Sequence, residues 1–195
     1  MASARTSKTP APAGAQAVPG AARGAAGKGN DRRRLKLLEL LLDVSRRVAK
    51  FGTLDEVLHG LIEITVAELG AERGSLFLND PATGELYSRV VKGKLRRELR
   101  LLNNTGVAGH VFTGGEPLIV HDAYADARFN KAIDEQTGFR TRSILAVPVR
   151  TVTGEVIGVV EALNKKKGRF TRRDLELLEA MTAQGALALQ GAQVI

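Results

Sequence analysis

Polar residues at the junction between a loop and two apolar strands are the part of this chain best suited to bind a small molecule. Glu161 interrupts the apolar run Val156–Leu163, and the loop before Ile144 carries Asp134, Thr137 and Thr141. Carboxylates accept hydrogen bonds and hydroxyls both donate and accept them, and a few such groups at the rim of an apolar cavity can fix a ligand. Two plainer interpretations stay open. Glu161 is alternatively a strand residue near an exposed sheet edge, and the loop residues alternatively make only local hydrogen bonds.

Nothing in the sequence indicates catalysis. The chain has no Cys, which excludes a thiol nucleophile, a disulfide and a thiolate metal site. No Ser/His/Asp order, phosphate-binding loop or paired-carboxylate motif stands out. The histidines at 59, 110 and 121 lack metal-ligand spacing with each other or with carboxylates. We therefore expect no enzyme activity, no catalytic residue and no metal site.

Alternation of apolar residues predicts the strands that must position these groups. Ile144–Val149 and Val156–Leu163, joined around Thr153-Gly154, indicate a hairpin at the middle of a sheet. Further strands are expected at 75–78, 86–91, 99–101 and 118–120, with an exposed basic loop over 92–100. A short helix over 104–112 begins with small residues, which leave its first backbone N–H groups open to an anion. The long polar stretch 122–139 contains three large apolar residues and is predicted to be an ordered lid.

Periodic leucines and valines predict three longer helices. These are 32–51, a second helix from Leu54 to Leu69 capped by Thr53 and Glu56 and followed by Gly70, and 171–193 capped by Thr171 and Asp174. Strands and helices segregate along the chain. The expected fold is therefore α+β, with a mainly antiparallel sheet of about six strands and the terminal helices packed together on one face. The apolar face of the first helix favours a homodimer through residues 35–51 and 171–192; the alternative is packing wholly within the monomer.

Charge and composition divide the chain of 195 residues at about residue 31. Residues 1–34 carry seven Lys/Arg and one Asp, so they hold +6 of the total net charge of +8. Residues 1–31, rich in Ala, Gly and Pro, are predicted to be a disordered basic tail, and 32–195 a single domain with its core at 53–170. A basic tail solubilises the chain or attracts nucleic acid. Without an apolar leader or membrane-length run, a cytoplasmic location is expected.

Four segments give the chain a family resemblance. They are Gly106–Val111, Asp122–Asn130, Thr137–Thr141 and Ile157–Lys165. From about Leu38 to Ala192 the chain resembles a GAF domain, and most of all the cyclic-nucleotide-binding GAF domains of phosphodiesterases and bacterial adenylyl cyclases. The family motif of Asn-Lys, Phe and Asp corresponds to Asn164, Lys165, Phe170 and Asp174, with Leu175 in place of the final Glu. The resemblance implies that Lys165 and Asp174 form a structural salt bridge.

The resemblance also implies a set of ligand contacts. Ser75 matches a strand residue that faces the base, Val107 and Ala108 match the helix start that holds the cyclic phosphate, and Glu161 matches a carboxylate on the last strand. The lid positions are Asn130, which makes a further phosphate contact, and Asp134, Thr137 and Thr141. Val91 and Lys92 stand where the family often has an aromatic residue that stacks on the base, followed by an acid. Ser75 alternatively has a purely structural role.

The resulting functional expectation is a non-enzymatic sensory domain. It would bind cAMP or cGMP as a ligand, need no other cofactor, and signal through its terminal helices in a dimer to a downstream protein. The alternative is a dimerisation or docking module with an empty pocket, whose basic tail recruits a partner or nucleic acid.

Overall fold

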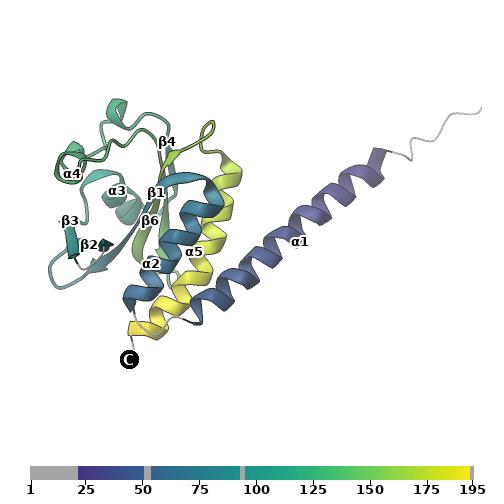
Figure 1. The fold of residues 1–195 in the computed structure, drawn as a ribbon, viewed down its shortest axis with the longest axis horizontal. Helices are drawn as coiled ribbons and strands as arrows, with labels where there is room; N and C mark the ends of the chain where they lie inside the picture. Colours follow the sequence, from purple (N-terminus) through teal and green to yellow (C-terminus); the bar gives the residue numbers. More distant parts are fainter. Residues whose placement is uncertain (1–21, 51–53, 93–94, 194–195) are drawn as a thin grey trace, which may run out of the picture. The chain divides into compact units, whose positions relative to one another are not determined.

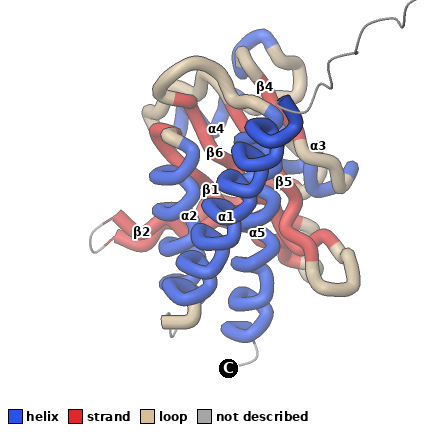
Figure 2. Tube along the Cα trace, turned by 90° about the vertical axis from the view of Figure 1, so that its right-hand side faces the viewer, coloured by secondary structure: helices blue, strands red, loops and turns tan. Residues whose placement is uncertain are grey.

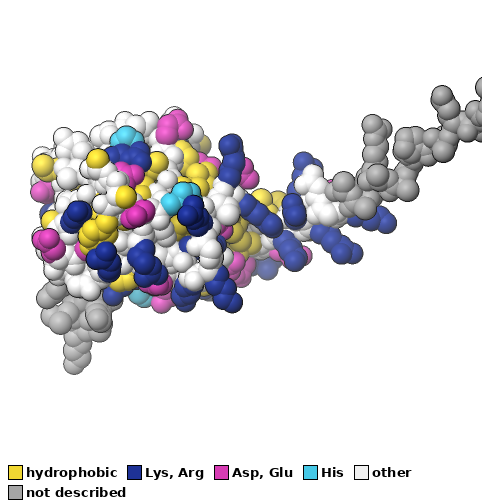
Figure 3. Space-filling model, turned by 90° about the horizontal axis from the view of Figure 1, so that it is seen from above, with side chains coloured by type: hydrophobic (Ala, Val, Ile, Leu, Met, Phe, Trp, Pro, Cys, Tyr) yellow, Lys and Arg dark blue, Asp and Glu magenta, His cyan; other side chains and the backbone are white. Residues whose placement is uncertain are grey.

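The computed structural model describes residues 22–50, 54–92 and 95–193. The chain divides into two compact units, Met1–Lys36 and Leu37–Ile195. In the first unit, residues from Ala22 onward are helical and belong to α1 (Ala22–Val48), along which Figure 3 shows Lys and Arg side chains. The predicted disordered tail lies partly outside the described residues. Over 22–31 it is helical instead, so the helix does not begin at 32 as predicted, because the alanines at 22, 25 and 26 favour helix.

The second unit is built on one six-stranded antiparallel sheet with the strand order β3-β2-β1-β6-β5-β4. β1 and β6 are central, and β5 and β6 form the predicted hairpin (Figure 1). This confirms the predicted α+β class. The strands are β1 (Ala71–Asp80), β2 (Glu85–Lys92), β3 (Leu95–Leu102), β4 (Leu118–Val120), β5 (Ile144–Arg150) and β6 (Val156–Lys165).

Helices cover both faces of the sheet. α2 (Leu54–Leu69) and α5 (Arg172–Gln193) lie side by side on one face (Figures 1 and 2), and the C-terminal part of α1 joins α5 through a hydrogen bond from Ser45 Oγ to Gln184 Oε1. α3 (Gly106–Gly114) lies on the other face, followed in the chain by η1 (Ala123–Ala125) and α4 (Lys131–Thr137). The predicted cap Thr53 lies outside the described residues, whereas Gly70 has a φ of 60° that suits the predicted end of α2.

Alternate strand residues feed two separate apolar clusters. On β6, Val160 and Ala162 pack in the cluster beneath α2 and α5, whereas Val159 packs in the cluster with α3. On β5, Leu145 and Ala146 divide in the same way. Because successive side chains on a strand point to opposite faces, Glu161 lies on the same face as Val159. That face carries α3 and the loop 122–143, called the lid below.

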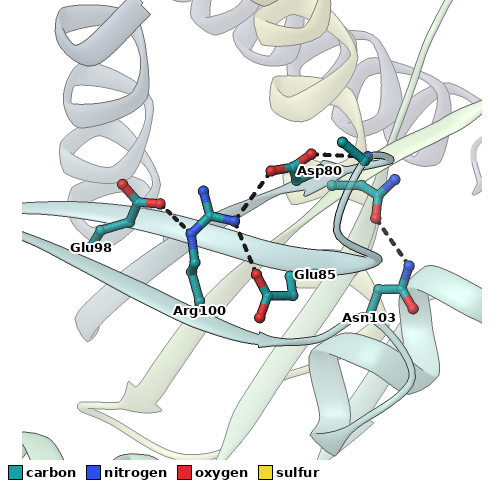
Figure 4. Close-up of polar contacts among 7 residues, drawn as sticks. Asp80, Glu85, Glu98, Arg100 and Asn103 are labelled. Carbon is teal, nitrogen blue, oxygen red and sulfur yellow. Dashed lines mark hydrogen bonds and ion pairs between the residues drawn. The ribbon is translucent and has the colours of Figure 1, made fainter.

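The region predicted as a basic loop over 92–100 is instead mostly strand. β2 continues to Lys92 and β3 begins at Leu95, so the strand starts four residues before the predicted Leu99. Arg100 on β3 connects β3 to β1 and β2 through hydrogen bonds to Asp80 and Glu85, and it also donates to Glu98 on its own strand (Figure 4). The charges concealed the strand in the sequence, because β3 is an edge strand and edges carry charged residues that discourage pairing with other chains.

No helix in the described part of the chain is both long and apolar enough to cross a bilayer.

Candidate functional site

Glu161 is the most unusual side chain on the lid face of the sheet. Its neighbours across the ladder are Ser75 on β1 and Ala146 on β5. Glu161 is only 8% exposed, and its carboxylate has no hydrogen bond or ion pair with the described residues. Because no fully buried side-chain oxygen or nitrogen in the described part lacks a partner, the Glu161 oxygens keep a small contact with solvent. Burial alone raises the pKa of Glu161 to about 7, since leaving water disfavours the charged form. The structure therefore places Ser75 and Glu161 opposite each other on neighbouring strands.

We expect this carboxyl to make stability depend on pH. Its folded-state pKa lies above the ordinary value of 4.5, so the native state binds the proton more tightly than the unfolded chain does. The contribution of this tighter proton binding to the free energy of unfolding is fully present below about pH 4.5. It is lost as the pH rises through 7. Relative to Glu161→Gln, the wild-type free energy of unfolding should fall by up to about 3 kcal/mol between pH 4.5 and pH 8. Urea titrations of both proteins across this range measure the difference, and parallel curves would refute it.

The start of α3 has backbone N–H groups that its N-cap side chain does not cap. Gly106 has a φ of 73°, and the N-cap residue Thr105 makes no side-chain capping bond to the helix. Val107 and Ala108, both predicted phosphate contacts, are buried in the first turn. A Cβ added to Gly106 would lie 3.5 Å from the Cβ of Asn130, so the predicted lid residue Asn130 lies against this helix end. The first turn of a helix favours an anion through its free N–H groups and its dipole.

The lid is organised by Asp134. Its carboxylate accepts hydrogen bonds from Tyr124 Oη at 2.9 Å, from Thr141 N at 2.7 Å and from Thr141 Oγ1 at 2.7 Å. The bond to Asp134 raises the pKa of Tyr124, because ionisation would remove its proton from that carboxylate. Asp134 and Thr141 are both buried. Asp134 and Thr141, both predicted ligand residues, are therefore hydrogen-bonded to each other.

The remaining lid positions also use their side chains locally. Asn130 Oδ1 caps α4 by accepting from Ala132 N, and Thr137 Oγ1 donates to Ile133 O. For the four predicted lid residues the structure thus shows the local hydrogen bonds of the plainer interpretation. Their polar atoms shape the lid before any ligand is present.

Aromatic rings stiffen the lid from outside. Tyr124 and Phe129 pack with ring centroids 5.3 Å apart, and the guanidinium of Arg140 lies 4.3 Å from the Tyr124 centroid. Arg73 on β1 lies 4.2 Å from the Phe139 centroid. Such contacts contribute about 0.5–1 kcal/mol each at exposed sites. They tie the lid to itself and to the start of β1.

Asn164 fixes the end of the lid. It is fully buried, with a φ of 58°, and its side-chain oxygen accepts from the backbone N–H groups of Arg142 and Ser143. Its side-chain nitrogen donates to Arg140 O at 2.9 Å and to Glu72 Oε2 at 3.1 Å. The resemblance placed Asn164 in a structural motif, but not in this role. Glu72 and Arg142, which pair with each other, were not predicted at all, since no local pattern marks a contact 70 residues apart in the chain.

The other motif residues lie on the far side of the same strand end. Lys165 Nζ lies 3.0 Å from Asp174 Oδ1 and 2.8 Å from Leu69 O, and so links β6, α5 and α2. Phe170 is buried beneath, with its ring centroid 5.9 Å from Lys165 Nζ. Asp174 also accepts from Thr171 N, as the predicted cap requires.

Val91 and Lys92 are not brought to the other site residues by the described strand pairing. They pair with Arg96 and Leu95 of β3, whereas the described pairing of β2 with β1 covers only Leu78 to Asp80 on β1. The side chains of Val91 and Lys92 lie outside the described part of the structure.

Two cavities have described linings, and both are on the other face of the sheet. One of about 10 Å³ lies in the core beside Thr65 and Thr182. A groove of about 410 Å³ runs between α5 and the end of β5, with the exposed Val152 and Leu187 in its lining. Neither is lined by the predicted ligand residues. The candidate site is thus defined by the positions of Glu161, the start of α3 and the lid, and not by either of these two cavities.

Comparison with known proteins agrees with this architecture. A model of the GAF domain matches residues 53–189. A probable 3′,5′-cyclic phosphodiesterase of Caenorhabditis elegans is 34% identical over 172 residues, which cover 82% of this chain and 24% of that protein. The dual 3′,5′-cyclic-AMP and -GMP phosphodiesterase 11 of Drosophila melanogaster is 31% identical over 182 residues, covering 85% of this chain and 12% of that protein. The chain thus spans about a quarter or less of these relatives.

Solved structures share the fold. The GAF domain of a phosphoenolpyruvate-protein phosphotransferase from Coxiella burnetii has a TM-score of 0.70 at 20% identity, covering 82% of this chain and 96% of that one. A free methionine-R-sulfoxide reductase from Neisseria meningitidis has a TM-score of 0.67 at 21% identity, covering 82% and 92%. The matched family model covers most of the chain, and the two TM-scores show that these solved structures share its fold. The chain belongs to the GAF domain family.

Proposed function

We propose that this GAF domain is a non-enzymatic sensor that binds a cyclic nucleotide between the lid and the sheet. The observation that carries the proposal is Glu161, a buried carboxylate without a protein partner at the centre of the lid face. A carboxylate with little access to water and no protein partner costs stability, and a ligand that donates hydrogen bonds to it would offset that cost. The cyclic phosphodiesterases that the chain resembles support this choice of ligand.

The chemistry of a cyclic nucleotide suits the groups around Glu161. Its phosphate has one negative charge, which the N–H groups at the start of α3, around Val107 and Ala108, can hold without an arginine. Its ribose hydroxyl and base N–H groups are donors that Glu161 and the Ser75 hydroxyl can accept. No further cofactor is needed, and the domain would act in the cytoplasm.

Binding would be reported by the lid. Opening and closing the lid changes the bonds that Asp134 and Asn164 make, and Asn164 precedes Lys165, which contacts both α2 and α5. A ligand shifts such an equilibrium only if it binds the two arrangements with different affinity. The signal would then pass through the terminal helices of a homodimer to a downstream protein.

Calorimetry tests the ligand directly. We expect cAMP, cGMP or both to give saturable heat with the whole chain at high micromolar protein concentration. Glu161→Gln should weaken binding by about 1.5–3 kcal/mol, as expected for loss of a hydrogen bond to a charged group. Glu155→Gln, on the exposed turn between β5 and β6, is the matched control and should bind as the wild type does. Absence of heat with both nucleotides would reject the proposal.

The alternative of a dimerisation or docking module is favoured by one observation. Leu38 and Leu42 on α1 are 57% and 58% exposed, an unusual exposure for a leucine stripe. If α1 pairs with a second copy, Leu38→Glu should convert a dimer to a monomer in sedimentation velocity. Val152→Glu, at a residue 81% exposed on the β5–β6 turn, is the control and should leave the oligomeric state unchanged. A wild-type chain that is monomeric at all concentrations would exclude both the dimer and this mode of signalling.

A further inference from the structure

We propose that ligand capture by this site is coupled to release of a proton from Glu161, so that the domain binds its ligand more weakly as the pH falls below neutrality. The inference rests on the proposed function and adds a form of regulation to it. The exchange is balanced: a neutral carboxyl gives up its proton to solvent and becomes a carboxylate that accepts hydrogen bonds from the ligand.

The geometry gives the empty site no means to stabilise a charge at Glu161. The strand neighbours of Glu161 on this face are Ser75 and Ala146 across the ladder, with Val159 and Leu163 along β6. The first turn of α3 contributes Val107 and Ala108. Apart from one hydroxyl these are apolar groups, so an ionised carboxylate there would have little water and no cation among the described residues.

Ionisable groups on the covering elements do not change this conclusion. They are His110 on α3 and nine lid residues: Asp122, Tyr124, Asp126, Arg128, Lys131, Asp134, Glu135, Arg140 and Arg142. Asp126 pairs with Arg128, Arg142 pairs with Glu72, and Asp122 is exposed. Asp134 is buried but committed to Tyr124 and Thr141, and His110, Lys131, Glu135 and Arg140 are exposed. None of them sets the ionisation of Glu161; burial alone raises its pKa to about 7. Without a ligand, Glu161 is therefore mostly the neutral carboxyl below about pH 7.

A ligand that brings hydroxyl or N–H donors reverses this preference. Donors to the carboxylate favour its charged form and lower its pKa, whereas the negative phosphate of the ligand raises it. The backbone N–H groups at the start of α3 offset the phosphate charge, so the donors determine the direction of the change. Below the midpoint of the free domain, each pH unit should then weaken binding by up to tenfold until the midpoint of the complex is reached. Above about pH 8 the affinity should no longer depend on pH through this group.

The test is calorimetry of cAMP and cGMP in buffers of different ionisation enthalpy, combined with a carbon-13 NMR titration of the Glu161 carboxyl in the free chain. We expect release of about one proton per bound nucleotide at pH 6 and almost none at pH 8.5. Glu161→Gln should abolish the release, and Glu155→Gln should retain it.

The outcomes separate the two proposals. Nucleotide binding without proton release, or with release that survives in Glu161→Gln, overturns the coupling and leaves the sensor function intact. A free-domain titration midpoint near the ordinary 4.5 overturns the coupling whatever binds. Absence of binding by both nucleotides at every pH rejects the sensor function, and the coupling with it.

Discussion

Replacing Asn164 with alanine is expected to lower the free energy of unfolding by about 3–5 kcal/mol and to free the end of the lid. The fully buried amide uses both of its N–H donors, and its oxygen accepts twice. Alanine would leave the N–H groups of Arg142 and Ser143 and the carbonyl of Arg140 without these partners. It must also adopt a φ of 58°, which costs a non-glycine residue about 1 kcal/mol or more.

Three variants separate these effects. Asn164→Gly keeps the left-handed backbone accessible and removes only the hydrogen bonds, so it should be less destabilised than alanine. Asn164→Asp keeps the shape but loses both donors and places a second carboxylate beside Glu72. Asn130→Ala removes a lid amide that only caps α4, and should cost about 1 kcal/mol.

Chemical denaturation measures the stability change, and amide hydrogen exchange at residues 140–143 measures release of the lid. Unchanged exchange at these residues in Asn164→Ala would show that the lid is held by other contacts.

Replacing Gly158 with alanine is expected to cost about 3 kcal/mol or more. A Cβ at this position of β6 would lie only 2.2 Å from the carbonyl oxygen of Phe77 on β1. Backbone cannot turn aside as a side chain does, so the two central strands would have to separate. Gly114→Ala, at the end of α3 with no atom within 4 Å of the added carbon, is the matched control. Urea midpoints of the two variants give the comparison, and equal midpoints would contradict the packing described at β1 and β6.

The fold was predictable because its signals are local. The apolar runs on either side of Thr153-Gly154 made the hairpin recognisable, and in the structure Gly154 has the positive φ, 88°, that such a turn uses. The charged edge strand β3 gave a weaker signal. Only residues 99–101 were predicted as strand, because Arg96, Arg97 and Glu98 conceal the alternation of its first half. The first turns of α1 are not evident from the sequence because they contain Gly24, Gly27 and Gly29, and glycine disfavours helix.

The candidate site was predictable only in part, because its contacts are not local. Glu161 was conspicuous as a single acid in an apolar strand, and the structure places it beside Ser75 as the resemblance implied. The use of Asp134 by Tyr124 and Thr141 could not be deduced, since spacing along a loop does not say whether a carboxylate faces a ligand or its own chain. Asn164 on β6 makes hydrogen bonds both to the lid and to Glu72 on β1. These contacts join segments that are far apart in the sequence, so only the folded chain shows them.

The central claim is that a small ligand enters between the lid and the sheet and is held by Glu161. Chemical-shift mapping by NMR with cGMP and cAMP on the isotope-labelled chain tests it most directly. The account predicts that the largest shifts fall on Ser75, Val107, Thr141 and Glu161, and that the groove along α5 near Leu187 is unaffected. Shifts confined to that groove, or none at millimolar nucleotide, would contradict it.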